Sequence, residues 1–283
     1  MSSKVRSILA AVDHDGNQAK RVAAKAVTLA RLTGAHLELF LCDADTAFSG
    51  RHQYEPEAAA RANESSLTES RHFLETLRRG LASDVEISLS VACESPLYEG
   101  IVHAVRRSRP DLVIRGAAAA MPLAPNDWEL VRACPAPLLL TRGLPWKTPP
   151  LIAAAVDVSP GESAELTHAI LRAAADLAQA ARGTVEVVHA GRYDEAPPPA
   201  ADSRRAALAE RARDADLEGV ECHLIGGEPA AALREFSARR GFDLIVLGAL
   251  THRKSLTALV GTLTGRLIES LDTDFLLVKP AHS

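Results

Sequence analysis

The chain repeats itself, and this internal repeat limits the folds that it can adopt. The segment SILAAVDHDGN near the N-terminus recurs as LIAAAVDVSPG in the middle of the chain, and this alignment pairs Asp13 with Asp157. A later segment, PDLVIRGAAAA, recurs as FDLIVLGALTH and pairs Gly116 with Gly248. Two tandem copies of one domain therefore account for the 283 residues.

Each copy alternates strands and helices. Both copies open with a short apolar strand that ends at an aspartate, continue into a stretch of helical period, and reach a second strand, AHLELFLCDA or GTVEVVHAG. In the second copy, HAILRAAADLAQAAR has apolar residues at helical spacing, and Gly183 follows it as a C-terminal cap. The pattern predicts an α/β fold of two tandem doubly wound domains, each with a five-stranded parallel sheet, related by a pseudo-twofold.

The boundary between the copies lies where prolines interrupt the pattern. The segment TRGLPWKTPP, residues 141–150, holds three prolines and a glycine between the last strand of one copy and the first strand of the next. We predict domains at 1–145 and 146–283. The segments 46–65 and 191–206 follow the second strand of each copy, and we interpret them as loop excursions.

Charge, cysteines and histidines exclude several classes of function. The formal net charge is −4, from 36 acidic and 32 basic residues that are well mixed along the chain, so no nucleic-acid partner is expected. The four cysteines form no CxxC pair and the ten histidines no HExxH or HxH motif, so we predict neither a metal site nor a catalytic residue. No apolar run is long enough for a membrane span, and the expected location is the cytoplasm, without a membrane partner.

One loop has features that suit a phosphate group. The segment GALTHRKSLTALVGTLTGR begins at Gly248, directly after an apolar strand, and Gly261 opens the next predicted helix. Backbone N–H groups at a glycine turn and at a helix N-terminus point outward, and the helix dipole favours an anion there. Glycine and threonine at such junctions also serve plain turns and caps, so a structural interpretation stays open. The further candidate donors and cations are Thr251, Thr262, Thr264, Arg253 and Lys254.

The spacing in this loop resembles that of the universal stress protein family. The loop reads Gly-x-x-Thr, nine residues, Gly-Thr, and AAAVDVS and FLLVKP accompany it at the first and last strands. In that family the motif reads Gly-x-x-Gly, nine residues, Gly-Ser/Thr, so Thr251 stands where the second glycine would be, and its Cβ restricts close approach of the backbone to a phosphate. The resemblance covers both copies and so nearly the whole chain.

The resemblance implies a nucleotide site in the second copy. In nucleotide-binding members, the motif wraps the phosphates and ribose, the acidic residue that ends strand one lies at the adenine or ribose, and a residue of strand two contacts the base. Asp157 has an alternative role as a turn or helix-cap residue. The positions that match are Asp157, Val158, Ser159, Val188, Gly248, Thr251, His252, Arg253, Gly261, Thr262, Leu263 and Thr264.

The first copy lacks this motif. After Gly116 comes AAAAMPLAPNDWELVRACPAP, without the spaced glycine or the basic pair, which resembles tandem family members with a degenerate first repeat. We expect Asp127 or Asn126 to be a helix N-cap there and Trp128 to pack against the core.

Three functions remain as alternatives. The resemblance implies a stress-response module of the tandem type that binds an adenine nucleotide, ATP with Mg²⁺, in its second copy. A second hypothesis is a stress scaffold without nucleotide that acts through protein or small-molecule contacts, and a third is a slow ATP hydrolase. Single-domain members of the family dimerise through their last strands, which implies a monomer with an internal pseudo-dimer here, the alternative being a homodimer. The protein partner is not identified by the sequence.

Overall fold

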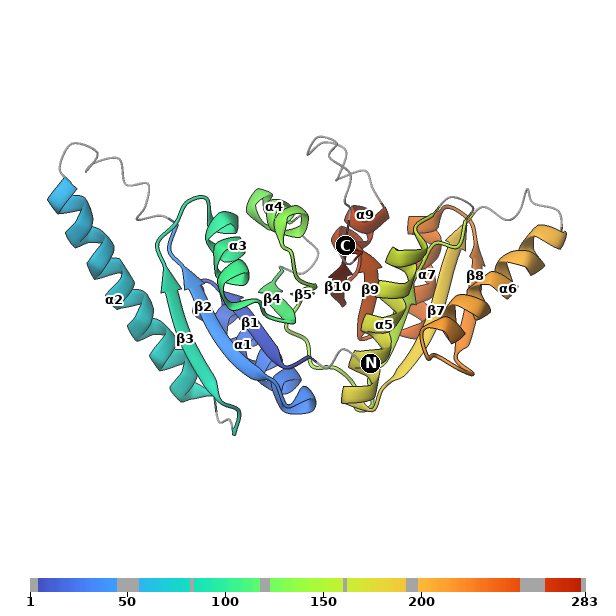
Figure 1. Cartoon of the computed structure of the whole chain (residues 1–283), viewed down its shortest axis with the longest axis horizontal. Helices are drawn as coiled ribbons and strands as arrows, with labels where there is room; N and C mark the ends of the chain where they lie inside the picture. Colours follow the sequence, from blue (N-terminus) through green and yellow to red (C-terminus); the bar gives the residue numbers. More distant parts are fainter. Residues whose placement is uncertain are drawn as a thin grey trace. The chain divides into compact units, whose positions relative to one another are not determined.

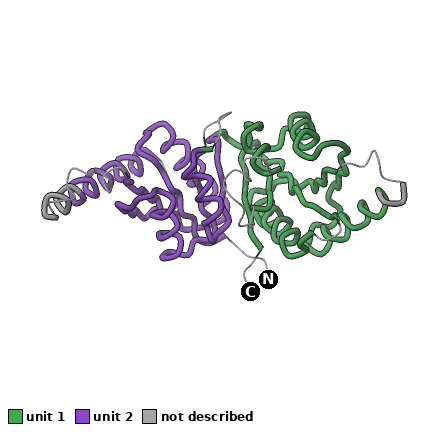
Figure 2. The backbone as a smooth tube through the Cα atoms, turned by 90° about the horizontal axis from the view of Figure 1, so that it is seen from above, with its two compact units in different colours: residues 1–4, 118–123, 144–283 green, residues 5–117, 124–143 purple. Residues whose placement is uncertain are grey.

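The structure is a computed structural model that describes residues 5–44, 56–81, 84–117, 123–159, 162–191, 198–249 and 263–280 (Figure 1). The chain forms two compact units (Figure 2). We call the unit of residues 5–117 and 124–143 repeat 1, and the unit that contains residues 144–283 repeat 2. Among the described helices, none is both long enough and apolar enough to cross a membrane.

Repeat 1 is a doubly wound domain around a parallel sheet. Helices α1 and α2 follow the first two strands and pack on one face of the sheet, and α3 and α4 pack together on the other. The strand order is β3-β2-β1-β4-β5, with parallel pairing throughout. The strands are β1 (Ser7–Val12), β2 (His36–Cys42), β3 (Ile87–Ala92), β4 (Leu112–Gly116) and β5 (Leu138–Thr141), and the helices are α1 (Gly16–Thr33), α2 (Pro56–Gly80), α3 (Leu97–Ser108) and α4 (Pro125–Ala133).

Repeat 2 has the same architecture. Its strand order is β8-β7-β6-β9-β10, again parallel, with α5 and α6 on one face and α7 and α9 on the other. The strands are β6 (Leu151–Ala155), β7 (Thr184–Gly191), β8 (Glu221–Gly226), β9 (Leu244–Gly248) and β10 (Asp274–Val278), and the helices are α5 (Ala164–Ala181), α6 (Pro198–Asp214), α7 (Pro229–Arg240) and α9 (Leu263–Ser270). Two doubly wound domains with five parallel strands each are confirmed.

The loop excursions predicted after the second strands are wrong in part. Helix α2 begins at Pro56, within the segment 46–65, and α6 begins at Pro198, within 191–206. Both helices start at a proline, which fits the first turn of a helix because its missing N–H has no partner to lose there. Proline at these two positions therefore opens a helix and does not mark a loop.

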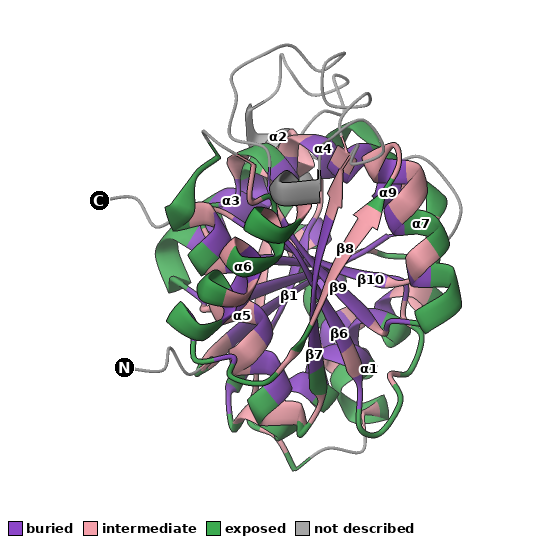
Figure 3. Cartoon of the chain, turned by 90° about the vertical axis from the view of Figure 1, so that its right-hand side faces the viewer, coloured by how far each residue is buried: buried purple, intermediate pink, exposed green. Residues whose placement is uncertain are grey.

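The core of each repeat lies between the sheet and its helices. The inner strands read as continuous apolar runs such as ILAAV and LIVL because helices cover both faces of each sheet, and they are buried along nearly their whole length. The outer strands β3 and β8 are only half-buried, as Figure 3 shows for β8. Phe40 of β2 and Phe275 of β10 are the largest fully buried side chains of the described residues. The carboxyl ends of the strands are therefore held in position by a closely packed core.

The repeat extends to individual hydrogen bonds. The carboxylate of Asp111, just before β4, accepts a hydrogen bond at 3.0 Å from the N–H of Ser7, where β1 begins. Asp243, just before β9, accepts one at 2.8 Å from the N–H of Leu151, where β6 begins. In both repeats an aspartate thus links the start of the fourth strand to the start of the first. Asp111 and Asp243 are paired when PDLVIRGAAAA is aligned with FDLIVLGALTH, and these hydrogen bonds confirm that alignment.

Candidate functional site

The winding direction of each sheet reverses between its first and fourth strands. In an open parallel sheet, ligands bind at the carboxyl ends of the strands at this reversal, which lies between β6 and β9 in repeat 2. Asp157 follows β6 and Gly248 ends β9, and these strands pair in parallel along their length. The fold therefore brings together two parts of the predicted nucleotide site. Five predicted members, Thr251, His252, Arg253, Gly261 and Thr262, lie outside the described residues.

Asp157 shapes a turn and also presents a carboxylate to the solvent. Its Oδ1 accepts a hydrogen bond at 2.8 Å from the N–H of Ser159, with Val158 between them, which is the pattern of an Asx turn. The side chain is 53% exposed. Ser163, and not Asp157, caps α5, since its hydroxyl accepts from the N–H of Leu166 at 3.1 Å. The turn interpretation is confirmed and the helix-cap interpretation is wrong, and the exposed carboxylate can still accept hydrogen bonds from a ligand.

The second strand supplies a buried histidine beside this carboxylate. His189 Nδ1 lies 3.0 Å from the carbonyl oxygen of Val156 and 3.7 Å from Asp157 Oδ1. A carbonyl oxygen only accepts hydrogen bonds, so the geometry assigns the proton to Nδ1. Val188, which the resemblance places at the base, is fully buried, and its carbonyl oxygen accepts from the N–H of Val156 at 3.0 Å. The side chain of Val188 therefore belongs to the core.

The glycines that end the fourth strands make room for helices. A Cβ on Gly248 would lie 2.8 Å from Cδ2 of Leu166 in α5. A Cβ on Gly116 would lie 2.8 Å from Cγ2 of Val22 in α1, the corresponding helix of repeat 1. Both distances are far below van der Waals contact between carbon atoms. The two glycines thus share a packing role that is independent of any phosphate.

Thr264 joins the start of α9 to the end of β9. Its hydroxyl donates a hydrogen bond at 3.3 Å to the carbonyl oxygen of Gly248, and the residue is buried. A threonine hydroxyl has one proton, so in this structure that proton goes to the main chain. Leu263 is the first residue of the helix. Thr264 therefore fixes where the helix begins relative to the strand, and this sets where the N-terminus of α9 points.

Repeat 1 fills the corresponding position with a buried ion-pair cluster. Arg115, near the end of β4, aligns with Leu247 and has a side chain that is only 6% exposed. Its Nη1 lies 2.6 Å from Oδ1 of Asp13, the counterpart of Asp157, and its Nε lies 3.0 Å from Oδ1 of Asp127 in α4. Burial raises the pKa of Asp127, an effect that the nearby Arg115 opposes. The carboxylate of Asp13 is thus already paired with an arginine of the same repeat.

The predicted N-cap of α4 is wrong. The capping position is Ala124, without a side-chain hydrogen bond, and Asp127 turns into the ion pair with Arg115, while Trp128 is buried as expected. The sequence held a signal for this cluster, because LVIRG places an arginine in an otherwise apolar strand. A charge in a strand that is covered on both faces has to find a partner.

Comparisons with known proteins agree with the fold. A model of the universal stress protein family matches residues 4–142 and again residues 152–279. Universal stress protein E of Photorhabdus laumondii is 21% identical over 280 residues, which cover 90% of this chain and 89% of that protein.

Two solved structures have a similar fold. A putative universal stress protein from Pseudomonas aeruginosa has a TM-score of 0.67 and 23% identity, over 98% of this chain and 94% of that one. A universal stress protein from Archaeoglobus fulgidus has a TM-score of 0.68 and 13% identity, over 98% of this chain and 97% of that one. Since the family model matches the chain twice, once in each repeat, the chain belongs to the universal stress protein family as a tandem member.

Proposed function

We propose that repeat 2 binds an adenine nucleotide, ATP with Mg²⁺, and that the chain acts in the stress response through this binding. The observation that carries the proposal is the difference between the two sheet reversals. In repeat 2 the carboxylate of Asp157 is 53% exposed and its Oδ1 accepts from a backbone N–H of its own turn. In repeat 1 the carboxylate of Asp13 is 28% exposed and is held by Arg115. One site is available to a ligand and the other is occupied by the protein.

Features of the repeat 2 structure and of its sequence support an adenine nucleotide as the ligand. A carboxylate accepts hydrogen bonds from ribose hydroxyls or from the amino group of adenine. Helix α9 is anchored to the end of β9 through Thr264, so its N-terminus is fixed near the carboxyl edge of the sheet, where its dipole favours phosphate. The loop that joins β9 to α9 carries the family-like spacing and the basic residues Arg253 and Lys254. Together these features support a site in which Asp157 contacts the ribose or adenine and the loop after β9 contacts the phosphates.

Repeat 1 does not offer the same site. A ligand that took the carboxylate of Asp13 would leave the buried Arg115 with one partner fewer. Breaking a buried ion pair costs about 3–5 kcal/mol, which would be subtracted from the binding free energy of the ligand. We therefore expect one nucleotide per chain.

The proposal is tested by the thermal unfolding midpoint of the full chain with and without ATP and Mg²⁺. A ligand that binds only the folded state stabilises it by about 2.7 kcal/mol at a concentration of 100 times its Kd. Asp157→Asn keeps an oxygen for the turn but removes the charge, and Gly261→Val adds a bulky side chain to the motif. Both should abolish the ATP-dependent shift, whereas Asp202→Asn, an exposed carboxylate on α6, should leave it unchanged. Equilibrium dialysis should give one nucleotide per chain, and two would contradict the assignment to repeat 2.

The two alternatives give different results in the same experiment. A scaffold without nucleotide would show no shift of the unfolding midpoint at millimolar ATP. A slow ATP hydrolase would show the shift together with release of inorganic phosphate, and the release should then disappear in Asp157→Asn. Binding without phosphate release is the outcome that we expect.

A further inference from the structure

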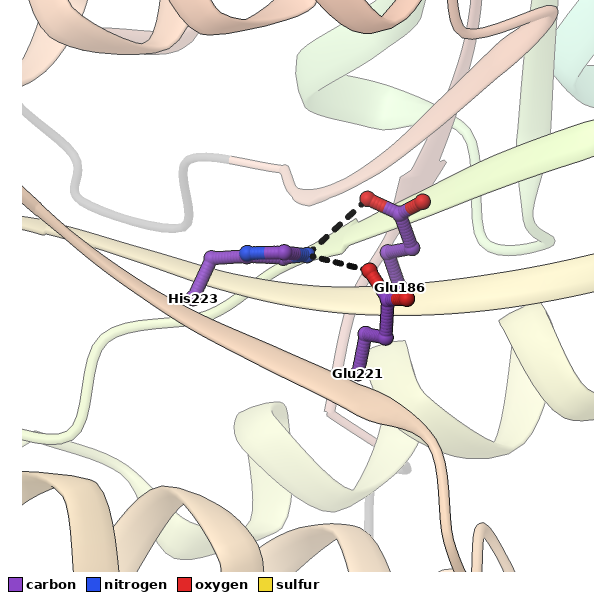
Figure 4. A group of neighbouring side chains, drawn as sticks. All are labelled: Glu186, Glu221 and His223. Atoms are coloured by element: carbon purple, nitrogen blue, oxygen red, sulfur yellow. Dashed lines mark ion pairs between the residues drawn. The ribbon is translucent and has the colours of Figure 1, made fainter.

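A second group of polar side chains lies away from the carboxyl edge of the repeat 2 sheet. Glu186 on β7 and Glu221 on β8 stand directly opposite one another in the parallel pairing, and His223 follows two residues later on β8. Because side chains alternate along a strand, Glu221 and His223 lie on the same face as Glu186. Figure 4 shows the imidazole pointing toward both carboxylates.

The imidazole of His223 lies close to two carboxylates without a hydrogen bond to either. Its Nε2 is 3.0 Å from Oε2 of Glu186 and 3.4 Å from Oε2 of Glu221. This nitrogen is buried, yet no hydrogen bond of acceptable geometry reaches it. The ring packs against Phe236 of α7, with the ring centres 4.9 Å apart, which fixes its direction. A buried nitrogen that is aimed between two carboxylates and lacks a hydrogen bond is costly unless something else satisfies it.

We propose that Glu186, Glu221 and His223 form a binding site for a divalent transition-metal cation of the zinc type. Zn²⁺ binds imidazole nitrogen and carboxylate oxygen at about 2.0–2.1 Å in tetrahedral geometry, which puts neighbouring ligand atoms about 3.3 Å apart. The two distances from Nε2 lie on either side of this value, and one ligand atom from each of the three side chains falls within 4.8 Å of the others. The two nitrogen–oxygen separations therefore already suit a single ion.

The surroundings leave room for a fourth ligand and for entry. A hollow of ≈ 910 Å³ adjoins the cluster and is lined by Glu186, Glu221 and Arg240, among other residues of repeat 2. Glu186 is only 2% exposed, whereas Glu221 is exposed to solvent. A hydrated ion can thus meet Glu221 first and lose water as it moves toward the buried carboxylate. A water molecule from the hollow would complete the coordination.

Arg240 now neutralises the two carboxylates and would compete with the ion. Its Nε lies 3.0 Å from Oε2 of Glu186, and its Nη2 lies 3.1 Å from Oε2 of Glu221. The side chain extends from the last turn of α7 and is 40% exposed, so it can turn into solvent. One guanidinium faces two carboxylates, and a divalent cation matches the charge of the two carboxylates more closely. The affinity for metal should therefore rise when Arg240 is removed.

The experiment is a Zn²⁺ titration of the tag-free full chain at pH 7.5, in competition with a chromogenic chelator. We expect one Zn²⁺ per chain at this site. Arg240→Gln should bind Zn²⁺ at least 10-fold more tightly, whereas His223→Gln and Glu221→Gln should each bind it at least 10-fold more weakly. Substitution with Co²⁺ should give the strong visible absorption of tetrahedral coordination, and His223→Gln should lose that absorption.

The matched control is His103→Gln. His103 also contacts a carboxylate, with its Nδ1 2.5 Å from Oε2 of Glu94, but no third ligating side chain among the described residues joins them, and its replacement should leave the affinity unchanged. Thermal unfolding of each metal-free variant shows whether it still folds. The proposal is overturned if the wild-type chain does not compete with the chelator, if His223→Gln binds Zn²⁺ as tightly as wild type, or if Arg240→Gln binds no more tightly. Each of these results would leave the cluster as a purely structural ion pair.

Discussion

Replacing Arg115 with methionine should destabilise repeat 1 by about 3 kcal/mol. Methionine keeps an unbranched apolar stem of similar length, so the change removes the charge and its hydrogen bonds more than it removes packing. The variant leaves the buried carboxylate of Asp127 without the Nε donor at 3.0 Å, and it leaves Asp13 without Nη1 at 2.6 Å. Loss of one partner from a buried ion pair costs about 3–5 kcal/mol, and we take the lower end because Asp13 is 28% exposed and can be hydrated.

A second substitution should restore much of this loss. In Arg115→Met/Asp127→Leu the buried carboxylate is gone, and replacing a whole buried ion pair by apolar side chains is often neutral or stabilising. The double variant should therefore recover at least half of the free energy that the single variant loses. If the single variant lost stability only through poorer packing, removing a second native side chain would lower the free energy of unfolding further. A higher free energy of unfolding in the double variant therefore shows that the unpaired charge caused the loss.

The loss in the single variant should shrink as the pH falls. Burial raises the pKa of Asp127, and Arg115 acts against this rise, so removing Arg115 raises the pKa further. A carboxyl whose pKa is higher in the folded than in the unfolded state lowers stability at neutral pH, and this penalty is relieved as the pH falls and the folded protein takes up a proton. The difference in the free energy of unfolding between wild type and Arg115→Met should thus be smaller at pH 5.5 than at pH 7.5.

The two tryptophans allow the measurement to be made on repeat 1 alone. Trp128 lies buried in α4 of repeat 1, and Trp146 belongs to repeat 2, so Trp146→Phe leaves one fluorophore that reports on repeat 1. In that background, urea denaturation followed by fluorescence should show a midpoint about 1.5 M lower for Arg115→Met, taking a slope of about 2 kcal/mol per molar urea. The reasoning would be refuted if Arg115→Met lost less than about 1 kcal/mol of its free energy of unfolding. It would also be refuted if the double variant were no more stable than the single variant.

Three further substitutions or reactions test other parts of the structure. Gly248→Ala places a Cβ 2.8 Å from Cδ2 of Leu166 and should cost repeat 2 about 1–3 kcal/mol in urea denaturation; unchanged stability would contradict the packing role. Glu228 is the N-cap of α7, and Glu228→Ala removes the acceptor of the Ala231 N–H at 3.0 Å, which should cost about 1 kcal/mol at neutral pH. Hydrogen bonding from that N–H lowers the pKa of Glu228, so this difference should fade as acid protonates the carboxylate, and a difference that persists in acid would exclude the cap as its cause. Burial raises the pKa of Cys42 to about 11, so this thiol should react with a disulfide reagent at pH 8 more slowly than the less buried Cys93, and modification of Cys42 before Cys93 in a mass-spectrometric time course would be the contrary result.

The fold was predictable because the features that define it are local and occur twice. The aspartates at Asp13 and Asp157, each after an apolar strand, and the apolar runs that follow at regular intervals, dictate parallel strands with crossover helices. The loop excursions predicted after the second strands are wrong in part because proline there opens a helix, as at Pro56 and Pro198. Proline signals an interruption in a sequence, but only the packing partners decide whether a helix follows.

The site was predictable only as far as alignment allows. Aligned positions share a place in the fold but not a role, as Arg115 and Leu247 show: one holds two carboxylates and the other packs in the core. Gly248 was interpreted as part of a phosphate loop, yet Gly116 has the same packing requirement in the repeat that lacks the loop. A glycine at the end of the fourth strand is thus only weak support for nucleotide binding. The exposed carboxylate of Asp157 supports the proposal more strongly.

The cluster at the other end of repeat 2 could not be read from the sequence. Glu221 and His223 are two residues apart, a spacing that gives no motif by itself. Glu186 joins them only because β7 and β8 pair in the register that sets it opposite Glu221. Strand register depends on tertiary packing and on turn geometry, neither of which the spacing of two side chains reveals.

The position of β8 has a consequence for the behaviour of the chain at high concentration. This strand ends the strand order of repeat 2, and the edge of a sheet exposes N–H and C=O groups on which a strand of another molecule can add. Ionic side chains on an edge strand discourage such growth, because an added strand would have to cover their charges. Glu221, His223 and the neighbouring Arg240 therefore protect this outer strand against the addition of a strand from another molecule.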